Sequence, residues 1–337
     1  MVSRQVKSVE PRLRAAATAF DVPEALRDEV ADFLAVLNGD HDDEDYLYQV
    51  IETRLDFLKS LTGSIEAQFH ADPERLAYLR NWFRQQTDAV FAKSNLMQRT
   101  RVWPEGYPGD YLTLEAIYAN RPHGEGLGGQ LDRYFLSRTL AVAVRSRLRM
   151  LCRLLSARTN AEPAGARWLN LAAGSCRELL FVPSAMVAQR HILCIDYDPK
   201  ALEYGKRLLS ERTGDALTFR TDNAFRMANA KRNIERYGKF TTIYSAGLFD
   251  YVKSEPLTRL IGGLYGSLAD DGVLIAPFKD AARYETFDYH WLVNWHYFLQ
   301  RSEDEIRRIF FEAGVPRENV TVTRDDSGVI LFFIVTR

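Results

Sequence analysis

Two short segments, Arg167–Leu180 and His191–Asp198, constrain the fold of this chain more than any other part of its 337 residues. The first reads as an apolar strand, a turn of small residues and the start of a helix. The second reads as another apolar strand that ends in acidic residues. Asp196 follows Gly174 by 22 positions, near the roughly 20 that separate the glycine turn from the ribose-binding acid in Rossmann-type βαβ units. We therefore predict a nucleoside-cofactor site here.

The same residues discriminate between two cofactors. The strict G-x-G-x-x-G pattern of NAD sites is absent, and Arg177 stands where helix–strand packing needs Gly or Ala. Glu178 would repel a pyrophosphate at the start of the helix. S-adenosylmethionine has no phosphate and carries a cationic sulfonium and ammonium, so it tolerates a carboxylate at this place. The pattern therefore favours S-adenosylmethionine over NAD.

Further strand patterns follow along the chain. Thr218–Ala224 contains a strand that ends in Asp222 and Asn223, and Phe240–Leu248 ends in small residues. After a fifth apolar run, Gly272–Phe278, come a capped helix and two strands around a turn; these last elements are Ser302–Phe311, Asn319–Thr323 and Val329–Val335. This order predicts a Rossmann-like α/β fold, with a doubly wound, mostly parallel sheet and a C-terminal antiparallel hairpin.

The segment Leu169–Cys176 resembles the first motif of class I S-adenosylmethionine-dependent methyltransferases, with Asn170 replacing the acid and Ala172 and Cys176 replacing glycines. The resemblance implies that Asp222 and Asn223 contact the adenine, and that the end of the fourth strand lies beneath the methionine part. The cofactor-binding residues that we predict are Tyr107, Asp110, Asn170, Ala172, Gly174, Ser175, Arg177, Glu178, Asp196, Tyr197, Asp222, Asn223, Ser245, Ala246 and Gly247.

The first part of the chain has helical periodicity. Apolar residues recur at helical spacing in Val22–Leu37, Asp45–Leu61 and Asp72–Phe91, with stops expected at Asn38–Asp40 and Thr62–Gly63. The acidic run His41–Asp45 suits a solvated helix start. Leu131–Ser156 reads as one long arginine-rich helix whose arginines we expect to form salt bridges. We predict a helical domain over residues 1–160 and a methyltransferase domain over residues 161–337.

An unusual loop, Trp103–Tyr111, lies between the helices. Its prolines and glycines fix a rigid path that carries three aromatic residues and Asp110. Two hypotheses stay open: a connector whose aromatics pack on the core, or a lid in which Gly106–Asp110 closes over the cofactor and over an acceptor held between the two domains.

This loop also carries a narrower resemblance. Gly106–Asp110, Ser175–Leu179, and Asn294–Tyr297 followed by Arg301 are similar to a bacterial group of class I methyltransferases with a helical N-terminal extension. The group includes extracellular-factor 3-hydroxypalmitate methyl ester synthases. The resemblance implies carboxyl O-methylation of a hydroxy fatty acid as one alternative, but it does not extend to the identity of the substrate.

Methyl transfer to N, O or C is an in-line displacement, so the protein mainly aligns the reactants, and it needs a base only when the acceptor must lose a proton. The predicted catalytic residues are Tyr107, Asp110, Tyr251, His290 and Trp295. The aromatic segment Tyr284–Phe298 suits a flat or apolar acceptor, a cationic amine, or plain core packing. The acidic residues Asp110, Glu115, Asp250 and Asp288 would suit the amine.

Composition narrows the partners. The net charge of −1 lacks the basic balance of nucleic-acid-binding proteins, so we expect a small-molecule substrate of natural-product or signalling-molecule biosynthesis and no nucleic acid. We find no apolar run of the roughly 18 residues that a membrane span needs and no signal-peptide pattern. The three cysteines suggest neither disulfides nor zinc, and we expect no metal.

Three further expectations concern the whole protein. We expect a cytoplasmic protein, and we leave a homodimer open. Cys176 and Cys194 lie near the predicted cofactor, where small buried side chains are a simpler interpretation than a catalytic thiolate. Because Ala172 and Cys176 depart from the usual glycines, a catalytically inactive S-adenosylmethionine-binding or scaffold protein is an alternative of a different class.

Overall fold

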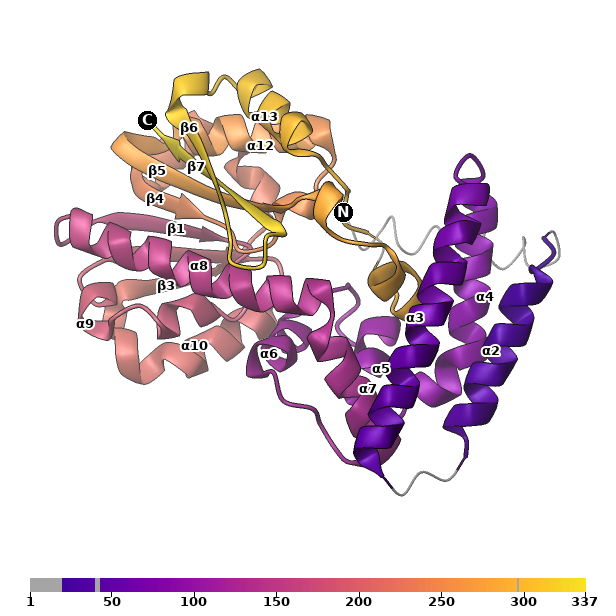
Figure 1. Cartoon of the computed structure of the whole chain (residues 1–337). Helices are drawn as coiled ribbons and strands as arrows, with labels where there is room; N and C mark the ends of the chain where they lie inside the picture. Colours follow the sequence, from indigo (N-terminus) through magenta and orange to yellow (C-terminus); the bar gives the residue numbers. More distant parts are fainter. Residues whose placement is uncertain (1–19, 40–42, 296) are drawn as a thin grey trace. The chain divides into compact units, whose positions relative to one another are not determined.

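The computed structural model describes residues 20–39, 43–295 and 297–337, which form two compact units (Figure 1). The first unit contains Met1–Ala141 and Glu285–His296, and the second contains Val142–Tyr284 and Tyr297–Arg337. The predicted domain boundary near residue 160 stays a prediction, because compact units within one structure need not be domains that fold independently.

The first unit is helical, as predicted for the N-terminal region. Its aromatic core includes Phe33 and Phe91, whose ring centroids are 5.9 Å apart. The helices of this unit are α2 (Glu24–Leu37), α3 (Glu44–Gln68), α4 (Pro73–Phe91), α5 (Asn95–Val102), α6 (Tyr111–Ala119), α7 (Gly126–Ser137) and η6 (Phe287–Leu292).

Helix α3 starts where the sequence predicts and ends later. The Asp43 carboxylate accepts hydrogen bonds from the backbone N–H groups of Asp45 and Tyr46 and caps the helix. Residues 41 and 42 of the predicted acidic start, and residue 40 of the predicted stop before it, lie outside the described residues. The expected stop at Thr62–Gly63 is wrong. Thr62 is buried and its hydroxyl donates to the Leu58 carbonyl, so the buried stripe continues to Ile65 and one glycine does not end the helix.

The expected single helix over Leu131–Ser156 is also wrong. Arg138 has an extended backbone (φ −71°, ψ 154°), which separates α7 from α8 (Thr139–Ala161). The Ser137 hydroxyl donates to the Tyr134 carbonyl in the last turn of α7. Apolar periodicity runs through the break without interruption, and therefore the pattern alone did not reveal it.

A seven-stranded sheet organises the second unit, in the order β3-β2-β1-β4-β5-β7-β6. Neighbouring strands are parallel from β3 to β5, and β7 runs antiparallel to both β5 and β6. The strands are β1 (Arg167–Leu171), β2 (His191–Asp196), β3 (Leu217–Thr221), β4 (Phe240–Tyr244), β5 (Leu268–Lys279), β6 (Val320–Arg324) and β7 (Ile330–Thr336). The predicted Rossmann-like, mostly parallel sheet with a C-terminal antiparallel hairpin is confirmed.

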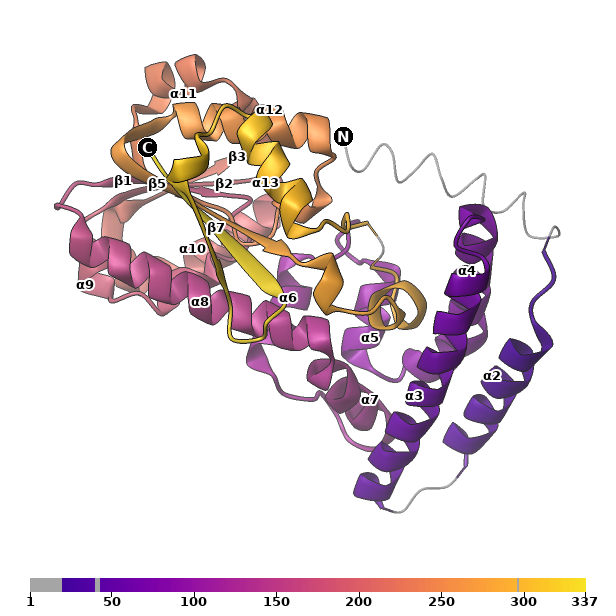
Figure 2. The ribbon, with the colours of Figure 1, turned by 45° about the horizontal axis from the view of Figure 1, so that its top comes forward.

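Helices cover both faces of this sheet (Figure 2). One face carries α8, α9 (Ser184–Val187) and α10 (Pro199–Thr213), and the other carries α11 (Ala230–Tyr237), α12 (Ser254–Gly266) and α13 (Glu303–Glu312). Double coverage explains why the central strands are almost continuously apolar and buried. The chain order reverses between β1 and β4, so the carboxyl ends of these strands form the crevice in which such folds bind ligands.

The C-terminal elements complete the core. Helix α13 has the predicted capping box between Ser302 and Glu305, and Gly314 adopts the left-handed φ of +84° that follows its end. Phe310 of α13 stacks on Phe333 of β7 with ring centroids 5.1 Å apart and planes 3° from parallel. This contact joins the antiparallel hairpin to the helical layer.

Candidate functional site

The turn after β1 has an unusual backbone. Ala172, Gly174 and Cys176 all adopt left-handed conformations, with φ of +52°, +54° and +53°. For a residue with a side chain this conformation costs about 1–2 kcal/mol, and the usual class I motif has glycine at the places of Ala172 and Cys176. The chain therefore keeps the glycine-type turn with only Gly174 of its glycines. Strain of this kind persists where the surrounding structure holds it, often at functional sites.

The surrounding structure holds the turn through Asp196 at the tip of β2. Its Oδ2 accepts a hydrogen bond from the Gly174 backbone N–H at 2.7 Å, and its Oδ1 accepts one from the Asp198 N–H at 2.9 Å. Burial raises the pKa of Asp196, against the opposing effect of these hydrogen bonds. A carboxylate has about four acceptor positions, so two backbone donors leave capacity for a ribose diol.

The helix predicted after the turn is a short 3-10 turn instead, η1 (Arg177–Leu180). Its Glu178 is buried, and one carboxylate oxygen accepts from the Asn170 amide at 2.7 Å and from the Tyr244 hydroxyl at 3.0 Å. Burial raises the pKa of Tyr244 well above its usual range, so this phenol stays protonated and donates. Asn170 and Glu178 therefore support the turn from inside the sheet; their predicted contact with the cofactor stays a prediction.

Other residues of the predicted cofactor set flank the turn. Ser175 is buried, Arg177 is half-buried and Tyr197 is 66% exposed beyond β2. Gly205 of α10, which sequence reasoning missed, packs directly on the turn: a Cβ at this position would lie 2.8 Å from the Ser175 carbonyl oxygen. The small residue that lets a helix approach the turn thus comes from the following βα unit, where the motif gives no signal for it.

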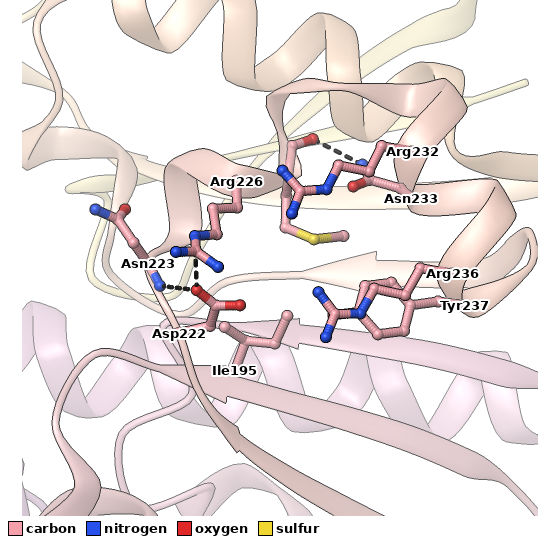
Figure 3. Close-up of a pocket in the computed structure, with 9 residues that line it drawn as sticks. Ile195, Asp222, Asn223, Arg226, Arg232, Asn233, Arg236 and Tyr237 are labelled. Carbon is pink, nitrogen blue, oxygen red and sulfur yellow. Dashed lines mark hydrogen bonds and ion pairs between the residues drawn. The ribbon is translucent and has the colours of Figure 1, made fainter.

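Asp222 and Asn223 follow β3 and border a small pocket (Figure 3). The Asp222 carboxylate accepts from the Asn223 N–H at 2.8 Å and pairs with Arg220 and Arg226 at 3.2 and 3.1 Å. Burial alone would raise its pKa, but these donors outweigh burial and lower it. Arg232 and Arg236 extend toward the same pocket from α11. Asp222 is therefore ionised and held in place at the position predicted for the adenine contact.

A buried cation lies beside the end of β4. Ser245 is fully buried, and its hydroxyl has no partner among the described residues. A Cβ on Gly247 would lie 3.1 Å from Nη1 and 3.3 Å from Nη2 of Arg147, on α8. Salt bridges were expected for the arginine-rich stretch, and Arg133 and Arg153 do pair with Asp45 and Asp326. Arg147, which is 5% exposed, does not pair within the described part of the chain.

A buried ion pair lies at the end of β5. Lys279 Nζ is 2.7 Å from the Asp250 carboxylate, and both residues are nearly inaccessible. Burial lowers the pKa of Lys279, and nearby Arg147 acts in the same direction, whereas Asp250 raises it. Lys279 Nζ also lies over the Phe298 ring at 4.5 Å and the Tyr251 ring at 5.7 Å. Tyr251, a predicted catalytic residue, is thus beside this pair.

The predicted lid loop lies in the first unit. Asp110 caps α6, accepting from the N–H groups of Leu112 and Thr113, and its Oδ1 is 2.6 Å from Arg99. Gly106 and Gly109 have left-handed φ values, and a Cβ on Gly109 would lie 2.7 Å from the Trp295 ring. The loop thus packs against Trp295, and both the connector and the lid hypothesis stay open. The predicted roles of Tyr107, Asp110 and Trp295 in binding and catalysis stay predictions.

The aromatic segment that ends with Trp295 also belongs to the first unit. Glu66 of α3 accepts hydrogen bonds from the Thr286 hydroxyl and the Trp291 indole N–H. His290 is buried beside Tyr289, with ring centroids 4.7 Å apart. Its role as a base stays a prediction, and His296 lies outside the described residues.

The two cysteines near the turn are fully buried. A hydrogen bond with Cys194, followed by burial, raises the pKa of Cys176 well above its usual range. Cys176 is therefore a protonated core thiol rather than a thiolate, as the simpler interpretation expected. In the described ranges, no group of three or more potential metal ligands occurs.

Residues outside the motifs are where sequence reasoning was incomplete. Arg147 and Gly205 carried no motif signal. Only the fold brings Arg147, Gly247 and Lys279 together. No helix of the described chain is long and apolar enough to cross a membrane.

Solved structures resemble this fold at low identity. A protein of Bordetella parapertussis, described as a possible exported protein, is 17% identical over 74% of this chain and 85% of its own, with a TM-score of 0.59. The CurJ carbon methyltransferase is 12% identical over 99% and 98%, with a TM-score of 0.49. The magnesium protoporphyrin IX methyltransferase of Synechocystis PCC 6803, with bound S-adenosylhomocysteine, is 13% identical over 67% and 94%, with a TM-score of 0.46. These likenesses concern the fold alone.

Sequence comparison is more specific about the family. No curated protein matches the chain. The profile of a family described as "putative methyltransferase" matches residues 75–277, which is more than half of the chain and includes β1 to β4 and most of β5. The chain therefore belongs to this methyltransferase family.

Proposed function

We propose that this protein uses S-adenosylmethionine to methylate a small-molecule acceptor. The observation that carries the proposal is Asp196: an acid at the tip of β2, hydrogen-bonded to the glycine of the β1 turn. This arrangement provides a carboxylate for the ribose diol beside a turn of small residues. Asp222 and Asn223 are the proposed adenine contacts, and Ser245, Ala246 and Gly247 are proposed to lie beneath the methionine part.

The reaction itself makes few demands on the protein. A lone pair on the N, O or C nucleophile forms a bond to the methyl carbon while the carbon–sulfur bond breaks. Its electrons neutralise the sulfonium, and S-adenosylhomocysteine leaves. If the nucleophile carries a proton, a base removes it, and Tyr251 and His290 remain the proposed candidates. The protein's contribution is alignment of the acceptor with the carbon–sulfur bond.

Two other functions remain as alternatives. Carboxyl O-methylation of a hydroxy fatty acid is a narrower form of the same activity. A binding protein without transfer is a separate class, and the departure from the usual glycines at the left-handed Ala172 and Cys176 is the reason to consider it.

Calorimetry with the full chain tests the cofactor. We expect S-adenosylmethionine and S-adenosylhomocysteine to bind and NADH not to bind. Binding of NADH without S-adenosylhomocysteine would overturn the proposal. A screen of small molecules with methyl-labelled cofactor then tests transfer: tight cofactor binding without transfer to any acceptor would favour the binding protein.

We further propose a cytoplasmic location, which the three buried, free cysteines support. A small-molecule partner rather than nucleic acid agrees with the net charge of −1. The oligomeric state, including the homodimer considered above, is a matter for light scattering.

A further inference from the structure

Arg147 is a buried cation without a counter-ion in the described part of the chain. It is 5% exposed, its Nε has no hydrogen-bond partner, and no ion pair there includes it. Removing a guanidinium from water is costly unless an anion and hydrogen-bond acceptors replace the water. A buried cation that the described residues leave unpaired therefore points to an anion supplied by a ligand.

The surroundings of Arg147 are adapted to its presence. The guanidinium approaches Gly247 so closely that a Cβ there would lie 3.1 Å from Nη1, and the guanidinium would have to move by a few tenths of an ångström. Two residues earlier, the fully buried Ser245 hydroxyl also has no partner within the described ranges. Two buried donors thus lie at the end of β4, the guanidinium of Arg147 from α8 and the hydroxyl of Ser245, and neither has a partner among the described residues. Both groups can donate hydrogen bonds to a ligand.

The buried side chains around the end of β4 carry a net positive charge. Lys279 and Arg301 are both buried, and Arg301 donates to the carbonyls of Phe249 and Val252. Asp250 is bound to Lys279 at 2.7 Å and does not pair with Arg147. The next acid along β5, Asp280, is bound to Arg324. The carboxylates at the end of β5 are thus already engaged, and the cluster has room for one more negative charge.

We propose that Arg147, with Lys279 beside it, binds an anionic group of the methyl acceptor, with a carboxylate as the best match. This rests on the proposed function, in which Asp196 and Asp222 hold the nucleoside over β2 and β3. Arg147 and Lys279 lie at the other side of the crevice, at the ends of β4 and β5. The planar guanidinium fork suits a carboxylate, whereas a cationic amine acceptor would meet repulsion here.

The carboxylate of the cofactor's methionine part is the other carboxylate that Arg147 could bind. It carries an ammonium on the adjacent carbon, and this second charge would be placed close to two buried cations. The acceptor's carboxylate brings no such charge, which is why we assign the site to the acceptor.

The test uses the full-length Arg147→Met variant, with Arg149→Met as its control. Arg149 is exposed on the same helix, so its replacement removes the same charge from the surface. Octanoate and benzoate serve as probes, and octanamide and benzamide as their uncharged counterparts, titrated calorimetrically with and without S-adenosylhomocysteine. We expect the wild type and Arg149→Met to bind the carboxylates at least tenfold more tightly than the amides, and Arg147→Met to lose this preference.

Three results would overturn the inference: carboxylates that do not bind the wild type, amides that bind equally well, or an unchanged preference in Arg147→Met. A fourth concerns the cofactor. If Arg147→Met weakens S-adenosylhomocysteine tenfold but leaves 5′-methylthioadenosine unchanged, the guanidinium holds the cofactor's carboxylate, because the second ligand lacks the amino-acid part.

Folding and the proposed function are controlled separately. If Arg147→Met does not fold, Arg147→Lys replaces it, because this variant keeps the charge and loses the planar fork of the guanidinium. Its preference for carboxylates over amides should be weaker than that of the wild type but should not vanish. A preference equal to that of the wild type would count against the proposal. Failure of the wild type to bind S-adenosylhomocysteine would refute the proposed function. Normal binding of S-adenosylhomocysteine without carboxylate binding would refute only this inference.

Discussion

The Asp196 carboxylate accepts a hydrogen bond from the backbone N–H of Gly174 at 2.7 Å. These are the two residues whose separation in sequence predicts the cofactor site. The bond fixes the turn after β1 against the tip of β2, so the turn and the acid that we propose to bind the ribose form one rigid unit. Pre-organisation of this kind reduces the entropy that binding must overcome.

Asp196→Asn should weaken S-adenosylhomocysteine at least tenfold. The amide loses charge-assisted hydrogen bonds worth about 1.5–3 kcal/mol each, and its NH₂ group must face one of the two backbone N–H donors, from Gly174 or Asp198. Calorimetry measures the loss. Asp215→Asn, at an exposed position after α10, is the control and should bind like the wild type; equal affinity in Asp196→Asn would remove Asp196 from the site.

The pH dependence of cofactor binding follows from the same residue. Burial raises the pKa of Asp196, and the ionised form is the better acceptor for ribose hydroxyls. The affinity for the cofactor should therefore be highest at neutral pH and should fall on acidification. The fall should begin at a higher pH than an ordinary aspartate would give. Calorimetric titrations from neutral to acidic pH test this, and in Asp196→Asn the fall should disappear.

The succession of strands along the chain was predictable because parallel strands that are buried on both faces leave a strong apolar signal, and β1, β2 and β4 each read as such a run. The ends of the helices were harder to predict from the sequence. A stop was predicted at Gly63 where the helix continues, and no break was predicted at Arg138 where the helix ends. In both places tertiary packing decides whether the helix continues. Propensity is a weak guide where burial decides the outcome.

The candidate site was predictable where chemistry follows a fixed spacing, as for Gly174 and Asp196. Arg147 was not, because an arginine in an amphipathic helix gives the same pattern whether or not a carboxylate faces it. Glu178 shows a related limit. Its position in the motif suggests contact with a ligand, but the motif gives no sign of the hydrogen bonds that it accepts from Asn170 and Tyr244.

Tyr244→Phe should destabilise the protein by about 1–3 kcal/mol. The variant removes the hydroxyl that donates to the buried Glu178 carboxylate at 3.0 Å, which leaves an acceptor without one of its partners. The midpoint of urea unfolding measures the effect. Tyr197→Phe, at a position that is 66% exposed, should change stability by less than about 0.5 kcal/mol; an equally small effect at Tyr244 would show that the bond contributes little.

The thiols should be unreactive in the native protein. All three cysteines are buried; burial raises the pKa of Cys152 to about 12, and the hydrogen bond with Cys194 raises that of Cys176. Since the thiolate is the nucleophile, iodoacetamide at pH 8 should label the chain slowly when folded and quickly in urea, as mass spectrometry can follow. Rapid labelling of Cys176 in the native protein would support the hypothesis that Cys176 is a catalytic thiolate.

Asp288→Asn should stabilise the protein at pH 7 and have little effect at pH 4. Burial raises the pKa of Asp288 to about 6 from an ordinary 3.8, although Arg138 opposes the shift. The folded state therefore holds more protons than the unfolded state between these values, so the free energy of unfolding falls as pH rises through this window. The shift corresponds to roughly 1–3 kcal/mol once solvent screening of this half-buried group is allowed for. Asp326→Asn is the control, and it should have the opposite effect. Arg153 lowers the pKa of Asp326, so this variant should lose stability at pH 7. Thermal unfolding at both pH values measures the two effects. If Asp288→Asn is less stable than the wild type at pH 7, the Asp288 carboxylate is ionised and stabilising in the folded protein.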